Sequence, residues 1–216
     1  MLHAVSHPSA PSRPGPLFLR SASTAPPVLP GAAVAIVGSR RPAHGAEVAF
    51  AFASQAARCG FAVVSGLALG CDSAAHRGCL EAGGVTVAVL PCGLDRVAPV
   101  SNTNLAHRIL NAAGFLASEY PPGTPAANFR FVERNRVIVA LSQAVIVTEA
   151  QIKSGTLHTA RFAINQNKPL ACYLPEDDPG GPGCLHLVER HNATPLRNPN
   201  DLKLSLNTPS CESQAL

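Results

Sequence analysis

The fold of this chain is decided by the stretch Ala33-Val34-Ala35-Ile36-Val37-Gly38-Ser39-Arg40-Arg41. Its unbroken apolar run is typical of a strand that is buried on both faces, as in a parallel sheet. Ligands of open parallel sheets bind outside the carboxyl ends of the strands. A strand that ends in a glycine, a hydroxyl and two guanidinium groups therefore indicates either a site for an anion or a tight turn with two solvated arginines.

The composition indicates a well-filled domain of ordinary size. The chain has 216 residues, of which 46% are hydrophobic and only 14% charged. No stretch approaches 18 consecutive apolar residues, so no membrane span is expected. The net charge is +4, and Lys and Arg outnumber Asp and Glu between residues 34 and 175. This balance permits a polyanionic partner without requiring one.

The seven cysteines are scattered and form no C-x-x-C pair. This spacing argues against both a zinc site and a disulfide framework. We expect most of them to be small buried hydrophobic residues in a reducing compartment, which favours a cytoplasmic location. We expect neither a metal nor another cofactor.

Three segments are expected from the distribution of proline, glycine and apolar residues. Residues 1–31 are rich in Pro and Ser and predict a largely disordered leader, with one short ordered piece around residues 17–19. Residues 32–207 predict an extended Rossmann-like domain, and residues 208–216 predict a frayed tail.

Within the domain, predicted strands alternate with predicted helices. The strands are expected at residues 33–37, 61–65, 86–90, 115–118, 144–148, 169–173 and 194–196. The helices are expected at residues 46–59, 73–82 with Asp72 as N-cap, 102–111, 135–141, 156–167 and 185–190. This alternation predicts an α/β fold with a doubly wound, mostly parallel sheet and helices on both faces.

Three predicted strand-to-helix loops carry groups that suit an anion. They are residues 38–41, residues 65–70 and residues 153–156. The last combines Lys153 and the hydroxyls of Ser154 and Thr156 with a helix N-terminus, where backbone N–H groups bind phosphate. None of the loops matches the dinucleotide or P-loop spacing. Each loop alone is more often structural, but three at one sheet edge favour an anion groove.

A fourth stretch, residues 128–136, interleaves two phenylalanines with arginines. Such a pattern suits a single strand of nucleic acid, whose bases stack on rings while guanidinium groups meet its phosphates. The alternative is the start of a helix whose phenylalanines enter the core and whose arginines pair with Glu133 or Glu149.

Candidate catalytic residues are few. His76 follows Asp72 by one helical turn, and a helix cap for Asp72 with a packed imidazole for His76 explains the pair better than catalysis does. Glu119 and Glu149 end predicted strands and are candidates for acid/base work or for holding nearby arginines. Ser65 and Ser154 have no histidine in a local nucleophile pattern, so no catalytic residue is assigned.

Six motifs in order resemble the DprA/Smf family of DNA-processing proteins. They are VAIVGSR at 34–40, SGLALGCDSAAHRG at 65–78, AVLPCGLD at 88–95, SEYPPG at 118–123, RNRVI at 134–138, and EA at 149–150 with KSGTLHTA at 153–160. The resemblance covers residues 30–175, the Rossmann-like core of the family. Cys71 and the pair Ala98-Pro99 depart from the family pattern.

The resemblance implies a non-enzymatic protein that binds single-stranded DNA as a homodimer and delivers it to a RecA-type recombinase in natural transformation. It implies that Arg40 and Lys153 hold phosphates, and that Phe131 stacks on a base, with Phe129 as the second choice. The other site residues that it implies are Gly38, Ser39, Gly66, Arg134, Asn135, Arg136, Ser154, Gly155 and Thr156.

Two alternatives stay open. One is a nucleotide sensor or phosphoribohydrolase-type enzyme with Glu119 or Glu149 as the acid/base, against which the absence of a Pro-Gly-Gly-x-Gly-Thr-x-x-Glu sequence counts. The other is a structural module that binds a protein partner and neither of these ligands.

Overall fold

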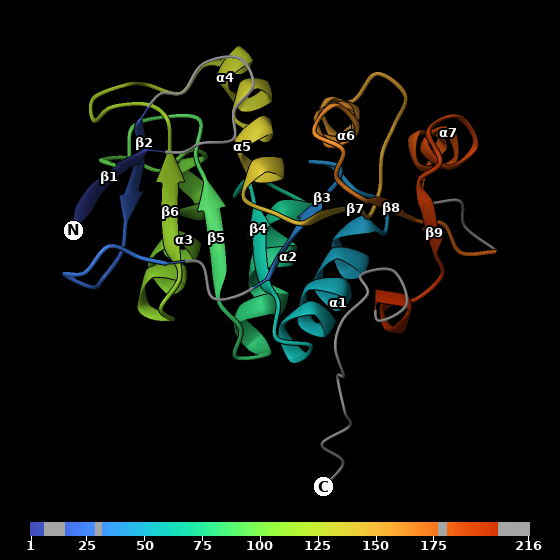
Figure 1. Cartoon of the computed structure of the whole chain (residues 1–216), viewed down its shortest axis with the longest axis horizontal. Helices are drawn as coiled ribbons and strands as arrows, with labels where there is room; N and C mark the ends of the chain where they lie inside the picture. Colours follow the sequence, from blue (N-terminus) through green and yellow to red (C-terminus); the bar gives the residue numbers. More distant parts are fainter. Residues whose placement is uncertain (7–15, 29–31, 177–180, 203–216) are drawn as a thin grey trace, which may run out of the picture.

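The computed structural model describes residues 1–6, 16–28, 32–176 and 181–202 (Figure 1). Within these ranges, nine strands form one sheet in the order β1-β2-β6-β5-β4-β3-β7-β8-β9. The strands are β1 Leu2–Ser6, β2 Pro16–Arg20, β3 Ala33–Val37, β4 Ala62–Ser65, β5 Thr86–Val89, β6 Phe115–Ser118, β7 Ala144–Val147, β8 Leu170–Tyr173 and β9 Thr194–Leu196. The seven strands from β3 to β9 pair in parallel, which confirms the predicted doubly wound α/β sheet.

Helices cover both faces of this sheet (Figure 1). They are α1 Gly45–Arg58, α2 Cys71–Glu81, α3 Thr103–Asn111, α4 Asn128–Glu133, α5 Asn135–Ala140, α6 Gly155–Asn165 and α7 Pro182–His191. Every residue of β3 is buried, as its apolar run predicts. Val34 and Ile36 pack with α1 and α2, whereas Ala35 and Val37 pack with the cluster that includes α5, α6 and α7.

The chain reverses its winding direction at β3. From β3 it proceeds through β4 and β5 to β6 on one side, and it then returns to place β7 on the other side. Strands β3 and β7 therefore flank a topological switch point, and the loops that follow them diverge at the carboxyl edge of the sheet. This is the place where open α/β sheets bind ligands.

The prediction of a largely disordered leader is wrong for two segments. Strand β2 pairs antiparallel with β6, and β1 pairs antiparallel with β2. Leu17 and Leu19 alternate into the core at 3% and 5% exposure, and Arg20 Nη1 donates a hydrogen bond to the Leu94 carbonyl at 3.0 Å. The short ordered piece expected at residues 17–19 is thus part of the sheet edge. The predicted tail, residues 208–216, lies outside the described residues.

The other corrections concern helix starts. Helix α2 begins at Cys71 with Gly70 at its N-cap, so the prediction of Asp72 as N-cap is wrong. The Asp72 carboxylate turns instead toward Arg134, at 3.7 Å. Residues 128–133 form α4, as the helical alternative predicts, but Phe129 remains 58% exposed and does not enter the core.

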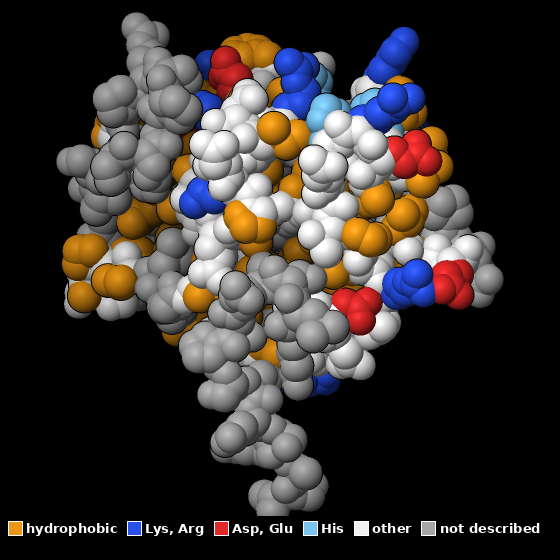
Figure 2. Space-filling view, turned by 45° about the vertical axis from the view of Figure 1, so that its right-hand side comes forward, with side chains coloured by type: hydrophobic (Ala, Val, Ile, Leu, Met, Phe, Trp, Pro, Cys, Tyr) orange, Lys and Arg blue, Asp and Glu red, His pale blue; other side chains and the backbone are white. Residues whose placement is uncertain are grey.

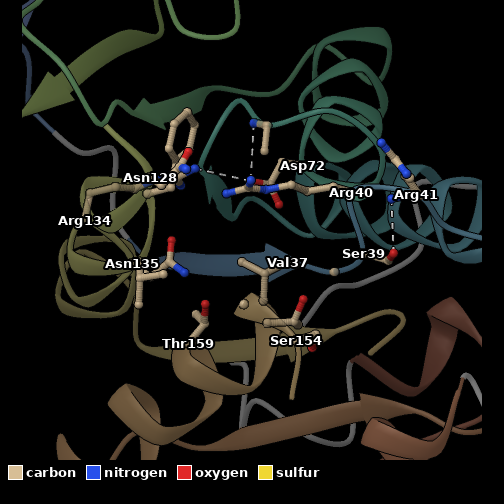
Figure 3. A pocket seen from close by; sticks show the side chains of 16 residues that line it. Val37, Ser39, Arg40, Arg41, Asp72, Asn128, Arg134, Asn135, Ser154 and Thr159 are labelled. Atoms are coloured by element: carbon tan, nitrogen blue, oxygen red, sulfur yellow. Dashed lines mark hydrogen bonds and ion pairs between the residues drawn. The ribbon is translucent and has the colours of Figure 1, made fainter. Parts of the chain in front are cut away.

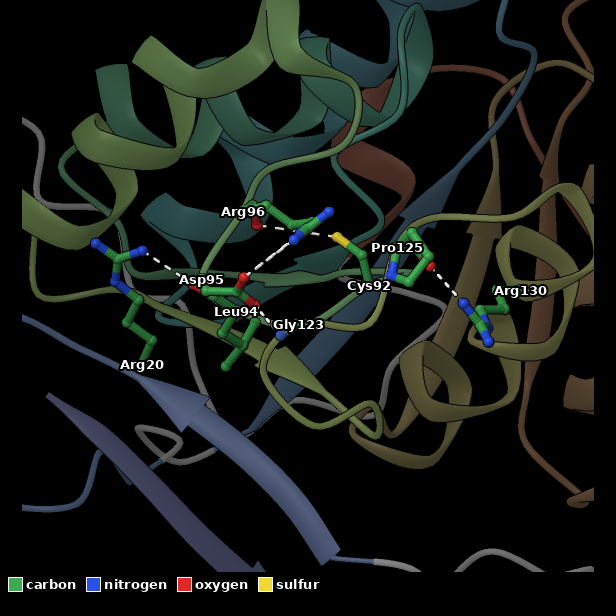
Figure 4. A network of polar contacts seen from close by, with 8 residues as sticks. All are labelled: Arg20, Cys92, Leu94, Asp95, Arg96, Gly123, Pro125 and Arg130. Carbon is green, nitrogen blue, oxygen red and sulfur yellow. Dashed lines mark hydrogen bonds and ion pairs between the residues drawn. The ribbon is translucent and has the colours of Figure 1, made fainter.

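The loops that follow β5 and β6 are tied together (Figure 4). Asp95 Oδ1 accepts a hydrogen bond from the Gly123 N–H at 2.8 Å, and this bond lowers the pKa of the Asp95 carboxyl. The Arg130 guanidinium donates to the Pro125 carbonyl. These contacts hold α4, and with it Phe129 and Phe131, beside the carboxyl edge of the sheet.

The cysteines of the described residues are buried, apart from the half-buried Cys59. This confirms the expectation of small buried hydrophobic residues for that part of the chain, while Cys211 lies outside it. None of the described helices has the length and apolar character needed to cross a membrane.

Candidate nucleic-acid interface

A cavity of about 570 Å³ opens at the switch point between β3 and β7 (Figure 3). Its walls come from the loops after β3 and β4, from α4 and α5, and from the start of α6. The predicted site residues that line it are Gly38, Ser39, Arg40, Phe131, Arg134, Asn135, Ser154, Gly155 and Thr156. The fold therefore brings all four predicted ligand-binding stretches around one volume: the loop after β3, the loop after β4 through Ala68, the start of α6 and the stretch from Asn128 to Arg136.

Arg134 is the cavity's buried cation, with only 3% of its surface exposed. Its Nη2 lies 3.7 Å from Asp72 Oδ2, whereas its Nε and Nη1 are buried without a hydrogen-bond partner among the described residues. A buried donor without a partner costs about 1–3 kcal/mol. An anion that reaches these N–H groups would remove that cost.

Burial dominates the ionisation of this pair. It lowers the pKa of Arg134 to about 10, with the Asp72 carboxylate acting in the opposite direction. Burial also raises the pKa of Asp72, against the pull of the Arg134 charge. One long ion pair thus leaves both charges poorly compensated, and the guanidinium retains unused donors for a second, anionic partner.

Gly66 does not line the cavity but makes room for Arg134. A Cβ atom at this position would lie 1.4 Å from Arg134 Nη1. Gly38 is needed for close approach as well, because its Cβ would lie 2.6 Å from Cys71 Sγ and 2.7 Å from Thr148 Oγ1. Both predicted glycines therefore shape the site through packing.

Arg40 is exposed at the mouth of the cavity, where its guanidinium stacks 4.7 Å from the centre of the Phe131 ring. The backbone N–H of the neighbouring Arg41 donates to Ser39 Oγ at 3.1 Å. One positive charge thus stands over one aromatic face.

The start of α6 forms the facing wall. Ser154 is its N-cap residue, yet its hydroxyl makes no capping hydrogen bond and its Oγ is buried without a partner in the described structure. Gly155 has open space where a Cβ would stand. The N–H groups of a first helical turn have no intrahelical partner. This wall therefore offers donors and the positive end of a helix dipole.

Two other predicted residues do not line the cavity. Lys153 is exposed beside it, in a left-handed backbone conformation with φ of 64°. Arg136 turns away and pairs with Glu119 at 2.7 Å. Glu119 therefore holds an arginine, as one of its two interpretations predicts, and the predicted DNA-binding residue Arg136 does not face the cavity.

The candidate catalytic groups have structural partners. His76 Nδ1 lies 2.7 Å from Thr86 Oγ1, its Nε2 accepts from the Leu67 N–H, and burial lowers its pKa to about 3. Glu149 accepts hydrogen bonds from the N–H groups of residues 43–45 at the start of α1. Among the described residues, no group of three His, Cys, Asp or Glu side chains is arranged to hold a metal ion.

The sequence prediction missed several lining residues. These are Val37, Arg41, Ala68, Asp72, Asn128, Val132 and Thr159. Arg41 belongs to the stretch from Ala33 to Arg41, and its guanidinium, next to that of Arg40, is the signal that would have added it to the predicted site. Whether Asp72 and Asn128 face the cavity depends on how α2 and α4 approach the sheet, and no local sequence pattern predicts that approach.

Cationic and imidazole side chains continue beyond the cavity. Figure 2 shows Lys, Arg and His side chains gathered along the upper border of one face, where α6 and α7 lie. Exposed residues of this kind on the two helices are His158, Arg161, Arg190 and His191.

This chain is similar to known proteins in sequence and in fold. The family model described as DNA recombination-mediator protein A matches residues 9–207. Protein Smf of Synechocystis is 42% identical over 82% of this chain, and the match covers 44% of that relative. The chain thus spans about half the length of the curated relatives it matches.

Two solved structures share the architecture. DNA processing protein A of Streptococcus pneumoniae has a TM-score of 0.76 and 31% identity, and the match covers 89% of this chain and 67% of that one. The protein of the same name from Helicobacter pylori has a TM-score of 0.78 and 28% identity, and the match covers 95% of each chain. The Helicobacter pylori structure is described as showing a single-stranded DNA binding mode.

Proposed function

Because this chain belongs to the DNA recombination-mediator protein A family, whose members are also called DprA and Smf, we propose that it binds single-stranded DNA at the cavity between β3 and β7. The observation that carries the proposal is the buried Arg134, whose Nε and Nη1 have no partner among the described residues. A phosphate offers the paired oxygens that a guanidinium group binds best.

In this proposal each wall has a role. Arg40 and Lys153 hold phosphates from opposite sides of the mouth, and the N–H groups at the start of α6 hold another oxygen. Gly38, Gly66 and Ser39 keep the loops in place around them. The single-stranded DNA binding mode described for the Helicobacter pylori relative supports this choice of ligand.

The phenylalanines supply the sequence-tolerant part of binding. Arg40 covers one face of the Phe131 ring. For a base to stack on that face, the Arg40 guanidinium must leave the ring, and a phosphate of the strand offers it a new partner. Phe129 is already 58% exposed and offers a second platform. Stacking of a base on an aromatic ring contributes about 1–3 kcal/mol and accepts any base.

The proposal extends to the use of the bound strand. The protein would protect single-stranded DNA and help to load it onto a RecA-type recombinase during natural transformation, as a homodimer in the cytoplasm and without catalysis of its own. The names of the family and of its members, as recombination-mediator and DNA-processing proteins, support the part of this extension that concerns recombination.

Binding of a fluorescent oligothymidylate, followed by anisotropy, tests the ligand and the site together. Arg40→Ala combined with Lys153→Ala should weaken binding about 100-fold, since each lost charge-assisted contact accounts for about tenfold. The matched control is Arg108→Ala combined with Lys168→Ala. It removes the same charge near the starts of β6 and β8, at the opposite edge of the sheet, and should change affinity only slightly. Equal affinities of the two double variants would refute the assignment of the site.

A further inference from the structure

The cavity offers donors from three directions around one small volume. Arg134 Nε and Nη1 are buried and unpartnered in the described structure, and Ser154 Oγ is likewise buried and unpartnered. The third direction is the mouth, where Arg40 stands exposed over Phe131. All of these residues line the same cavity (Figure 3).

The charge of this lining exceeds that of one phosphodiester. Three guanidinium groups, from Arg40, Arg41 and Arg134, face one carboxylate, from Asp72. An internal phosphodiester carries a single negative charge, whereas a terminal phosphate monoester carries close to two at neutral pH. The monoester therefore matches the net charge of the lining more closely.

The number of donor directions leads to the same choice. An internal phosphodiester has two free oxygens, because its other two bind the sugars on either side. A terminal monoester has three free oxygens and a single link to the strand. It can present one oxygen to Arg134, one to Ser154 and the start of α6, and one to Arg40.

We propose that the cavity binds the terminal phosphate of a strand, a phosphate monoester, in preference to an internal phosphodiester. This inference rests on the proposed function only in taking nucleic acid as the ligand. The same chemistry occurs in a free nucleoside monophosphate, whose size suits a cavity of this volume. End recognition would place the protein at the tip of a strand, with the remaining bases free for a partner.

The experiment compares three oligothymidylates of one length, labelled at an internal base. One has hydroxyls at both ends, one a 5′-phosphate and one a 3′-phosphate, and anisotropy gives each Kd. A phosphorylated end should bind at least about tenfold more tightly than the hydroxyl-ended strand. Ser154→Ala should bring the ratio close to one, whereas Thr194→Ala, which removes an exposed hydroxyl from β9, should leave the ratio unchanged.

The outcomes separate this inference from the proposed function. Tight and equal binding of all three strands would keep the proposed function and overturn end recognition. If no strand binds, the proposed function fails, and calorimetry with dTMP and thymidine decides the inference by itself. Binding of dTMP without thymidine would uphold the monoester site, and binding of neither would refute it.

Discussion

The absence of a side chain at Gly66 decides whether the buried guanidinium of Arg134 fits beneath the loop that follows β4. Gly66 and Gly155 both belong to the predicted site, yet their surroundings differ. The Gly66 Cα faces the Arg134 guanidinium, whereas a Cβ on Gly155 would meet nothing within 4 Å. Local sequence marks both as loop glycines, and only the packed structure separates them.

Substitution of each glycine by alanine tests this difference. Gly66→Ala should lower the free energy of unfolding by about 1–3 kcal/mol and weaken DNA binding, because the added methyl displaces Arg134. Gly155→Ala should change stability by less than about 1 kcal/mol. Urea denaturation measures both, and equal stability of the two variants would contradict the packing described for Arg134.

His76 gives the fold a predictable response to acid. Burial is the main cause that lowers its pKa from 6.5 to about 3, with the charges of Arg134 and Arg77 acting in the same direction. Between these values the unfolded chain takes up a proton that the folded protein does not. As the pH is lowered through this range, the free energy of unfolding should therefore decrease, by up to about 1.4 kcal/mol per pH unit from this group.

The variant His76→Gln isolates that contribution. Its stability should depend on pH less steeply than that of the wild type between pH values of about 6 and 4, because glutamine does not titrate. Asp72, whose raised pKa acts in the opposite sense, is present in both proteins and cancels in the difference. Parallel stability profiles from urea titrations would show that His76 does not stay neutral in the fold.

At the scale of elements, Glu149 connects the two halves of the sheet. It follows β7, and its Oε2 accepts hydrogen bonds from the Ala43 and Gly45 N–H groups at 2.9 Å. The carboxylate thereby satisfies the start of α1, the helix that follows β3. The sequence placed Glu149 at a strand end but left open whether it acts as an acid/base or as a structural anchor.

Glu149→Ala should lower the free energy of unfolding by about 1–3 kcal/mol, because the buried Gly45 N–H and two partly buried N–H groups lose their acceptor. Glu149→Gln retains an acceptor and should cost less. Thermal and urea unfolding measure both, with Glu81→Ala, an exposed carboxylate of α2, as a control that should change little. Unchanged stability of Glu149→Ala would argue against the anchoring role.

Strands and helices of the core were predictable because their signals are local. The apolar run of β3 and the positions of β6 and β9 were predicted at the residues where they occur. The pairing of Arg134 with Asp72 was not, since the two residues lie far apart in sequence. Strand β2 was predicted only as a short ordered piece, because the prolines and serines that flank it obscure the alternation of Leu17 and Leu19.

At the scale of the whole molecule, the parallel sheet collects separate loops at one edge. Family resemblance and strand order together place the loops after β3 and β7 side by side. The width of the cavity depends instead on α4 and α5, whose approach is set by long-range contacts such as Asp95 with Gly123. The sequence therefore predicts which loops meet, and packing determines which of their side chains face the ligand.

The salt dependence of single-strand binding tests the central claim most directly. If about four phosphates are bound at and around the cavity, log K should fall against log salt with a slope of roughly −3, at about 0.7 per contact. Arg40→Ala should make that slope less negative by about 0.7, and Arg108→Ala should leave it unchanged. An Arg40→Ala slope and affinity equal to those of the wild type would contradict the placement of DNA phosphates in the cavity between β3 and β7.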